Sequence, residues 1–391
     1  MLSTMSAVAL ELNSSYYTTV AGSSSADDFS VSTTDSANST SASYMLPAYI
    51  RITSMVACIV VMVLGVVGNL MVPLVVLRGK DMRNSTNIFL VNLSVADLCV
   101  LLVCAPTLLV EVNSLPEVWR LGEHMCKAVP FVEMTVAHAS VLTILAISFE
   151  RYYAICEPLR AGYVCTKARA TWLCLLAWAA AALCTSPIIW ITQYEEYWTN
   201  NTNYLETQGN STVVPTCLAE VKTLATMSFF LILVFFFFFF LPLLILLVLY
   251  SIIVRHLVRD SATASTSESQ HIRSRRQVVM MLLTVVFSFF ICLTPFHMLT
   301  LYVVLIPADK VTRHSEAYYN VLYFSRIMFY LNSAVNPILY NLMSTRFRIG
   351  FLRLCGFARR RGHDRGTFRS TLTSTRISRR MTRKDQQEIF L

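Results

Sequence analysis

Ionisable and hydrogen-bonding side chains stand inside several long apolar runs of this sequence. Asp97 lies in LSVADL, Asn69 lies in GVVGN, and Asn336 directly precedes Pro337. Charged groups are costly inside a bilayer, so each is a candidate functional residue. Asp97 with nearby amides and hydroxyls could hold a sodium ion or a proton. The alternative is a protonated Asp97 that only hydrogen-bonds neighbouring helices together.

A second polar pattern follows one helical face of a later apolar run. Glu133, Ser140 and Arg151 are spaced so that the two charged residues share a face, about 27 Å apart. An acid, a hydroxyl and a cation along one face predict a helix that faces the inside of a bundle. Glu133 then either binds a ligand or forms a structural salt bridge, for which Arg326 is the predicted partner.

The composition of the chain indicates the environment that surrounds these polar residues. Of 391 residues, 55% are hydrophobic and 14% are charged, and the mean hydropathy is +0.55. Soluble domains average ~45–50% apolar and ~25% charged residues. This composition predicts a membrane protein. It argues against a soluble enzyme, a nucleic-acid-binding domain, a disulfide-rich secreted module and a disordered regulator.

Seven apolar stretches are each long enough to cross a bilayer, which takes about 20 helical residues. They cover 50–77, 86–112, 125–156, 170–192, 224–254, 277–305 and 317–341. The backbone must satisfy its own hydrogen bonds in lipid, and period-two alternation is absent, so we predict helices rather than a barrel. The expected architecture is an all-α membrane protein with a seven-helix bundle over 46–343. It is flanked by disordered segments at 1–45 and 356–391, and a short amphipathic helix spans 344–355.

The basic residues predict the orientation of the bundle. They gather after the first, third, fifth and seventh stretches, and the segment from Ser344 onward has 13 Lys and Arg against 3 Asp and Glu. Because cytoplasmic loops are enriched in Lys and Arg, these segments are predicted to be cytoplasmic, with the amino terminus outside. The net charge of +9 thus fits topology and anionic lipid, not nucleic acid. Glycosylation sequons fall outside at Asn13, Asn38, Asn200 and Asn210.

Two cysteines fall on the predicted outer side. Cys126 begins the third stretch, and Cys217 lies in the long loop between the fourth and fifth. An oxidising compartment favours a disulfide between them, the alternative being two free thiols. At the other end, residues 344–355 have Phe347, Phe351 and Leu354 on one face among arginines, which predicts a helix lying on the inner leaflet. Cys355 ends this helix as a palmitoylation candidate or a free surface thiol.

Short motifs then occur in a characteristic order over residues 50–355. They are GN at 68–69, LSVADL at 93–98, Cys126, ERY at 150–152, Trp178, Pro242 with Tyr250, Pro295, and NPILY at 336–340. In these motifs the chain resembles rhodopsin-like G-protein-coupled receptors. The stretch VLTILAISFERYYAICEPL resembles the ghrelin, neuromedin and thyrotropin-releasing hormone receptor group. CKAVPFVEMTVAHASVLTIL and YFSRIMFYLNSAVNPILYNLM resemble receptors for ecdysis-triggering hormone.

The resemblance implies roles for the matched residues. A sodium pocket is implied at Asp97, Ser140, Asn332, Ser333 and Asn336. A G-protein switch is implied at Glu150, Arg151, Tyr152, Tyr250, Phe289, Pro295, Asn336, Pro337 and Tyr340. Two departures stand out: Leu293 replaces the usual tryptophan before Pro295, so Phe289 is expected to carry more of the switch, and HIRSRRQVV offers no acid to lock Arg151. We therefore expect a weakly held resting state with some ligand-free signalling.

The outward half of the bundle is the predicted ligand site. Two carboxylates in a cleft attract a cation, and guanidinium pairs with them bidentately. The predicted site comprises Glu111, Glu133, His138, Phe296, His297, Tyr302, Tyr323, Arg326 and Tyr330. For each aromatic residue alone, ordinary helix packing is the alternative. Span seven has no lysine for retinal, and Glu133 stands where amine receptors have an Asp.

The resemblance implies a ligand and partners. Ecdysis-triggering hormones end in Pro-Arg-x-amide, so we expect an amidated peptide whose Arg meets Glu133, with Gq coupling and calcium mobilisation. Ser and Thr of the tail are candidate receptor-kinase sites that recruit an arrestin. Neuromedin-, pyrokinin- or thyrotropin-releasing-hormone-type receptors are the alternatives, and a transporter is a remote one. No catalytic motif is present, so we expect no enzyme activity and no cofactor beyond an allosteric sodium ion.

Overall fold

The computed structural model describes residues 45–79, 84–116, 118–199, 212–219, 224–263, 269–306 and 315–354. The predicted sequons Asn13, Asn38, Asn200 and Asn210, Cys355, and most of both terminal segments lie outside the described residues.

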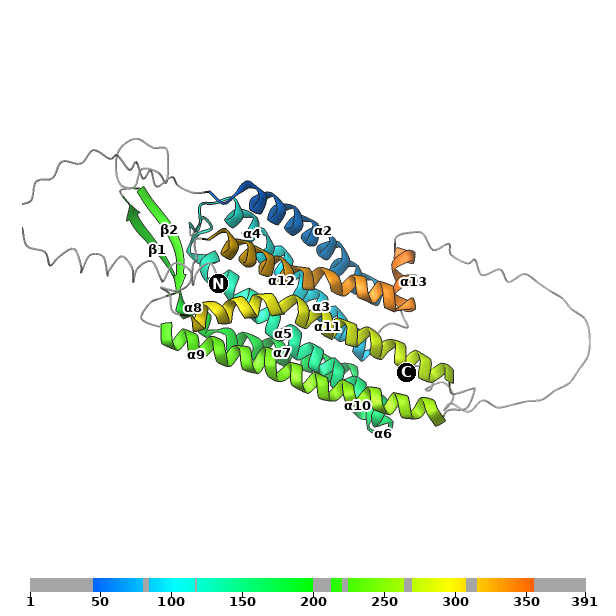
Figure 1. Ribbon diagram of the computed structural model, residues 1–391. Coiled ribbons are helices and arrows are strands. Elements are labelled where there is room, and N and C mark those ends of the chain that lie inside the picture. Colours follow the sequence, from blue (N-terminus) through cyan, green and yellow to red (C-terminus); the bar gives the residue numbers. More distant parts are fainter. Residues whose placement is uncertain are drawn as a thin grey trace, which may run out of the picture.

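Long helices packed side by side make up the molecule (Figure 1). Among the described residues, six are long and apolar enough to cross a membrane: Ala48–Arg78, Ser85–Val112, Gly122–Cys156, Lys167–Ile191, Ser228–Ser261 and Arg275–Leu305. The seventh is α12 (Glu316–Met343), which is less apolar because it carries polar side chains that the bundle buries, such as Arg326, Asn332 and Asn336. The predicted seven-helix bundle is therefore confirmed.

The second span contains a π-helical turn just before a proline. It consists of α3 (Ser85–Cys99), a π-helical turn (Val100–Cys104) and α4 (Ala105–Val112). Pro106, in the first turn of α4, has no backbone N–H to donate. The Cys104 carbonyl in the π-helical turn accepts hydrogen bonds from two hydroxyls, those of Thr107 at 2.7 Å and Tyr330 at 3.3 Å. The turn thus gives α12 a backbone contact deep in the bundle.

The fifth span carries a similar turn within its phenylalanine run. It comprises α9 (Leu224–Phe235), a π-helical turn (Phe236–Phe240) and α10 (Leu241–Thr263). Within this run Phe239 is buried, whereas Phe236, Phe237 and Phe240 are exposed. The wide turn distributes consecutive phenylalanines over both faces of the helix.

A β-hairpin covers one end of the bundle. Strands β1 (Thr192–Thr199) and β2 (Thr212–Ala219) pair antiparallel, with Tyr194 opposite Cys217. They follow α7 (Lys167–Thr185) and α8 (Pro187–Ile191). The predicted disulfide is present and ties Cys217 of β2 to Cys126 in the first turns of α5 (Gly122–Cys156). The hairpin is therefore fixed above the third span.

The first and seventh spans approach each other closely at glycines. A Cβ on Gly68 of α2 (Ala48–Arg78) would lie 2.8 Å from Pro337, and one on Gly65 would lie 3.4 Å from Ala334 and 2.5 Å from Leu101 of the second span. Neighbouring Asn69 donates hydrogen bonds to the carbonyls of Gly65 and Ser333, at 2.9 and 2.7 Å. Glycine is needed here because only a residue without a side chain allows this contact.

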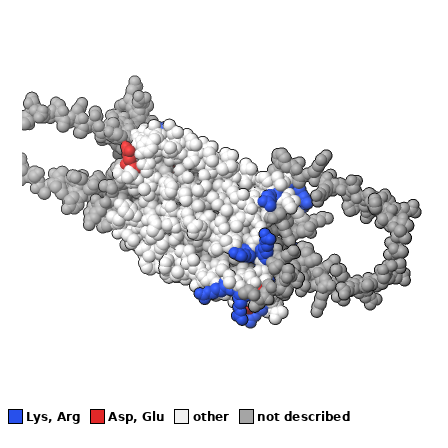
Figure 2. All heavy atoms as spheres, turned by 45° about the vertical axis from the view of Figure 1, so that its right-hand side comes forward, with Lys and Arg blue, Asp and Glu red and all other residues white. Residues whose placement is uncertain are grey.

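The remaining elements lie at the end opposite the hairpin. They include α6 (Pro158–Val164), the start of α11 (Ser269–Leu305) and the predicted amphipathic helix, observed as α13 (Thr345–Leu354). Figure 2 shows Lys and Arg side chains near this end and acidic side chains at the other, with an uncharged surface between them. That surface is rich in exposed Leu, Val, Ile and Phe, as a helix bundle in lipid requires.

Candidate functional site

Four side chains from three spans form a buried polar cluster in the half of the bundle nearer the hairpin. Arg326 of α12 forms ion pairs with Glu111 of α4 and, at 3.6 Å, with Glu133 of α5. The Tyr330 hydroxyl lies 2.7 Å from Glu133 Oε1 and accepts a hydrogen bond from Arg326 at 3.2 Å. The predicted contact between Glu133 and Arg326 is thus observed, and Glu111 shares it.

The cluster has an uneven charge. One guanidinium faces two carboxylates, and the side chains of Arg326 and Glu133 are each 5% exposed. Removing charged groups from water is costly unless they are paired, so a site with two acids and one cation favours a further positive group. The arrangement can therefore attract a further cationic group from a ligand.

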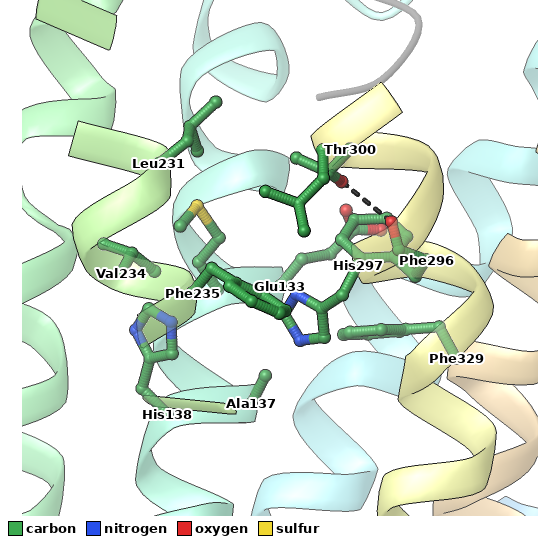
Figure 3. A pocket seen from close by; sticks show the side chains of 12 residues that line it. Glu133, Ala137, His138, Leu231, Val234, Phe235, Phe296, His297, Thr300 and Phe329 are labelled. Carbon is green, nitrogen blue, oxygen red and sulfur yellow. Dashed lines mark hydrogen bonds between the residues drawn. The ribbon is translucent and has the colours of Figure 1, made fainter. Parts of the chain in front are cut away.

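A narrow cavity of about 30 Å³ lies next to this cluster, between α5, α9, α11 and α12 (Figure 3). Its wall includes four residues predicted from the sequence: Glu133, His138, Phe296 and His297. This space holds only a few water molecules, since one water needs about 10–15 Å³. A peptide side chain can enter only if aromatic side chains of the wall move.

The other predicted ligand residues are placed differently. Glu111, Arg326 and Tyr330 adjoin the cavity through the charged cluster. Tyr323 is buried on α12, and Tyr302 is 40% exposed on α11; neither lines the cavity. Their part in a ligand site therefore stays a prediction.

The sequence did not identify the remaining cavity residues, which are Met134, Ala137, Leu231, Val234, Phe235, Thr300, Leu301 and Phe329. Phe235 lies between the two histidines in Figure 3, with its ring centroid 5.8 Å from that of His297. His138 stacks on Phe238 at 4.0 Å and lies 3.0 Å from the Thr185 hydroxyl. In the sequence, residues four positions apart lie on the same face of a helix, as Glu133 and Ala137 or Phe296 and Thr300 do. This spacing could have identified some of the cavity residues.

A second buried polar group surrounds Asp97, in the middle of the bundle. Asn336 donates a hydrogen bond of 3.1 Å to its carboxylate. Ser140, Asn332 and Ser333 are also buried. Among the described residues, the side-chain oxygens of Asn332 and Asn336 have no hydrogen-bond partner. The amide oxygens of Asn332 and Asn336 and the carboxylate of Asp97 are oxygen ligands of the kind that hard cations prefer.

We call the end of the bundle opposite the hairpin, where Lys and Arg side chains gather, the basic end. Two residues hold Arg151 there. It donates to the Thr86 hydroxyl of α3 and pairs with neighbouring Glu150 at 3.3 Å. Thr86 in turn donates to Glu150 at 3.2 Å. Arg151 thus pairs with its sequence neighbour Glu150, and Thr86, which the sequence did not single out, links the pair to the second span.

The cytoplasm-facing base predicted for the sixth span is hydrogen-bonded to the seventh span. Gln277 of α11 donates a hydrogen bond of 2.7 Å to the Met343 carbonyl at the end of α12. No acid was available in HIRSRRQVV to hold Arg151, and this amide provides a different interhelical contact. The base of α11 is therefore bonded to the seventh span rather than to Arg151.

The other predicted switch residues lie in or beside the core. Tyr250 is buried 3.2 Å from the Ser148 hydroxyl, and Tyr152 donates to Glu157 at 3.3 Å. Tyr340 is fully buried and packs on Phe347 of α13. Pro295 and Pro337 lie inside α11 and α12. Leu293 and Phe289 are both buried, and the Phe289 ring contacts Phe290.

Comparison with known proteins agrees with this arrangement. The family described as "7 transmembrane receptor (rhodopsin family)" matches residues 68–340. Growth hormone secretagogue receptor type 1 of Sus scrofa is 37% identical over 77% of this chain and 80% of its own length. The thyrotropin-releasing hormone receptor of Gallus gallus is 32% identical over 75% of each chain, and the Caenorhabditis elegans neuromedin U receptor homolog nmur-2 is 30% identical over 75% of this chain and 76% of its own. These relatives are receptors rather than enzymes. The chain belongs to the rhodopsin family of seven-transmembrane receptors, as a multi-pass protein of the plasma membrane.

Proposed function

We propose that this receptor binds an amidated peptide of the ecdysis-triggering-hormone type, ending in Pro-Arg-x-amide, and activates a heterotrimeric G protein. The observation that carries the proposal is the charged cluster, in which Arg326 faces both Glu111 and Glu133. The peptide's arginine pairs with Glu133, and Arg326 keeps Glu111. The acidic end of the bundle steers a basic peptide towards this cleft.

The signalling part of the proposal concerns the basic end. By the positive-inside rule this end is cytoplasmic, which places the amino terminus and the hairpin outside. Arg151 leaves Thr86 and Glu150 when the G protein binds, and the base of α11 moves outward by a shift in population. Gq coupling with calcium release is the expected route. Receptor kinases and arrestin act afterwards on the basic tail, which lies outside the described residues.

The buried group around Asp97 supports a further element of the proposal. Asp97, Ser140, Asn332, Ser333 and Asn336 bind a sodium ion that favours the resting state. The support is their burial together and the two amide oxygens without partners. Sodium adds positive charge beside Asp97 and is displaced when the helices repack.

The first experiment is calcium mobilisation in cells that express this chain with an amino-terminal epitope tag. Antibody staining of intact cells tests the orientation. A Pro-Arg-x-amide peptide and its free acid are compared with thyrotropin-releasing hormone and neuromedin-type peptides. A response to the amide but not the acid supports the proposal. A response only to one of the other peptides assigns that ligand, and peptide-evoked ion flux without G protein contradicts the receptor mechanism.

A further inference from the structure

The tryptophan side chains that the structure describes fall into two pairs with different surroundings. Trp119 is buried and Trp178 is half-buried, and each indole N–H donates a hydrogen bond of 2.9 Å to an oxygen of the protein. Trp172 and Trp190 are 72% and 71% exposed, and neither indole N–H has a hydrogen-bond partner among the described residues. The exposed pair therefore lacks the contacts that hold the other two rings.

Both exposed tryptophans lie on the fourth span, one near each end. This span, Lys167–Ile191, combines α7 with α8, and it begins at the basic end and finishes beside the hairpin (Figure 1). At a rise of about 1.5 Å per residue, Trp172 and Trp190 are about 27 Å apart along the helix. Their spacing is close to a whole number of helical turns, so both side chains point to the same side of the span.

The surface between the two tryptophans is apolar. Leu176 and Leu183 are exposed there, and the sequence has no Asp, Glu, Lys or Arg between Trp172 and Trp190. Beyond Trp172, towards the basic end, Arg169 is exposed. Charge thus begins within one helical turn of that tryptophan, and the apolar stretch ends there.

An indole ring is suited to one depth of a bilayer. Its large apolar face is favourable in hydrocarbon, whereas its N–H is costly there without an acceptor. The boundary between acyl chains and headgroups meets both requirements, because lipid ester carbonyls accept a hydrogen bond, and tryptophan is enriched at this depth. Two exposed rings at opposite ends of one span therefore mark the two boundaries of the hydrocarbon.

We propose that Trp172 and Trp190 anchor the receptor to the two faces of a phospholipid bilayer whose hydrocarbon core is about 27 Å thick, or slightly less because spans are usually tilted. Each indole N–H donates to a lipid ester carbonyl, the exposed leucines between them contact acyl chains, and Arg169 lies among the phosphates. Sterol-rich plasma membrane is thicker, at about 32–33 Å, so the receptor favours the thinner, sterol-poor parts of its membrane.

The first measurement determines the depth of the two rings by fluorescence quenching. The full receptor is reconstituted into nanodiscs of phosphatidylcholine that carries bromine either near the ester groups or near the chain ends. Subtracting the signal of Trp172→Phe or Trp190→Phe from that of wild type isolates each ring. Leu183→Trp, at an exposed position within the apolar stretch, is the depth control.

Bromine near the ester groups should quench both difference signals at least about twofold more strongly than bromine near the chain ends. The signal gained in Leu183→Trp should show the opposite preference. Difference signals that chain-end bromine quenches better, or that neither lipid quenches, would overturn the proposal.

The second measurement varies the thickness of the bilayer. Dimyristoleoyl, dioleoyl and dierucoyl phosphatidylcholine form thin, intermediate and thick bilayers, and a thiol-reactive dye reports unfolding because Cys58, Cys104 and Cys174 are buried. Wild type should have its highest apparent unfolding temperature in dioleoyl lipid and lose about 4 °C or more in dierucoyl lipid.

The variant that combines Trp172→Leu with Trp190→Leu should lose clearly less in the thick bilayer, because leucine is tolerated inside a wider hydrocarbon core. Leu176→Ala combined with Leu183→Ala changes the same exposed face without touching an anchor, and it should keep the wild-type dependence. Equal stability of wild type in dioleoyl and dierucoyl lipid, or an undiminished loss in the tryptophan double variant, would contradict the proposal.

Discussion

The Tyr330 hydroxyl lies 2.7 Å from Glu133 Oε1, so the third and seventh spans share a hydrogen bond beside the proposed ligand cleft. Arg326 bonds to the same tyrosine one helical turn away. A ligand arginine that takes Glu133 must therefore loosen a contact between two spans. The proposed binding mode therefore couples ligand binding to helix rearrangement through these three side chains.

Glu133→Gln tests the ligand contact. The change keeps the shape of the side chain and its hydrogen-bond acceptor but removes its charge, so peptide potency should fall about ten- to hundredfold, as a charge-assisted pair contributes about 1.5–3 kcal/mol. Calcium dose–response curves, normalised to surface expression, give the measurement. Glu123→Gln is the control, since Glu123 pairs with Lys127 at the exposed start of α5. Unchanged potency in Glu133→Gln would remove this residue from the site.

Arg326→Ala should damage stability more than Glu133→Gln. It leaves the buried carboxylates Glu111 and Glu133 without their cation, and breaking such a pair costs about 3–5 kcal/mol. We expect a lower unfolding temperature in detergent and reduced surface expression. The triple variant, in which Arg326→Ala is combined with Glu111→Gln and Glu133→Gln, should recover much of the loss. If the triple variant is no more stable than Arg326→Ala, the cluster is not held together by charge.

Thr86→Val removes the hydroxyl that holds Arg151 and keeps a side chain of similar shape. Agonist-free signalling should rise about twofold or more, because the resting contact of Arg151 loses a charged hydrogen bond. Basal inositol phosphate, scaled to receptor number, reports the change. Thr171→Val is the control, since its hydroxyl bonds to a carbonyl of its own helix. Equal basal activity of both variants would argue against this role of Thr86.

Gln277→Ala tests the contact between the sixth and seventh spans. Loss of the 2.7 Å bond to the Met343 carbonyl frees the base of α11, so basal signalling should again increase. Thr284→Ala is the control, since the hydroxyl of half-buried Thr284 bonds to the Met280 carbonyl of its own helix. Because Thr86 and Gln277 hold different spans, the effects of the two variants on the activation free energy should add when they are combined. If Gln277→Ala has the same basal signalling as wild type, the hydrogen bond from the Gln277 side chain does not restrain the helix.

Asp97→Asn tests the proposed sodium site. In wild type, replacing potassium by sodium at constant ionic strength should weaken agonist binding, because the ion favours the resting state. The variant lacks the negative charge that attracts the cation, so its binding should be equal in both salts. Radioligand binding to membranes measures the effect. Sodium sensitivity that persists in Asp97→Asn places the ion elsewhere.

The sequence predicted the spans and the partners in the charged cluster better than it predicted local geometry. Apolar length is sufficient to locate helices in lipid, and a buried Glu133 requires a cation such as Arg326. Strand pairing after α8 and the π-helical turns depend on neighbours that no local pattern encodes. The same holds for Thr86 and Gln277, whose roles arise only when α3 meets α5 and α11 meets α12. Tyr302 was assigned by type alone, and its orientation on α11 moved it out of the cavity.

The close approach of Gly68 to Pro337 indicates how variants at this position will impair the cell. Any larger residue at position 68 forces the first and seventh spans apart, so the helix pair assembles incorrectly before a ligand is ever met. Such a variant should be retained by cellular quality control. Its carrier would lack receptors at the surface, and raising the hormone concentration would not compensate, whereas a drug-like chaperone that stabilises helix packing would.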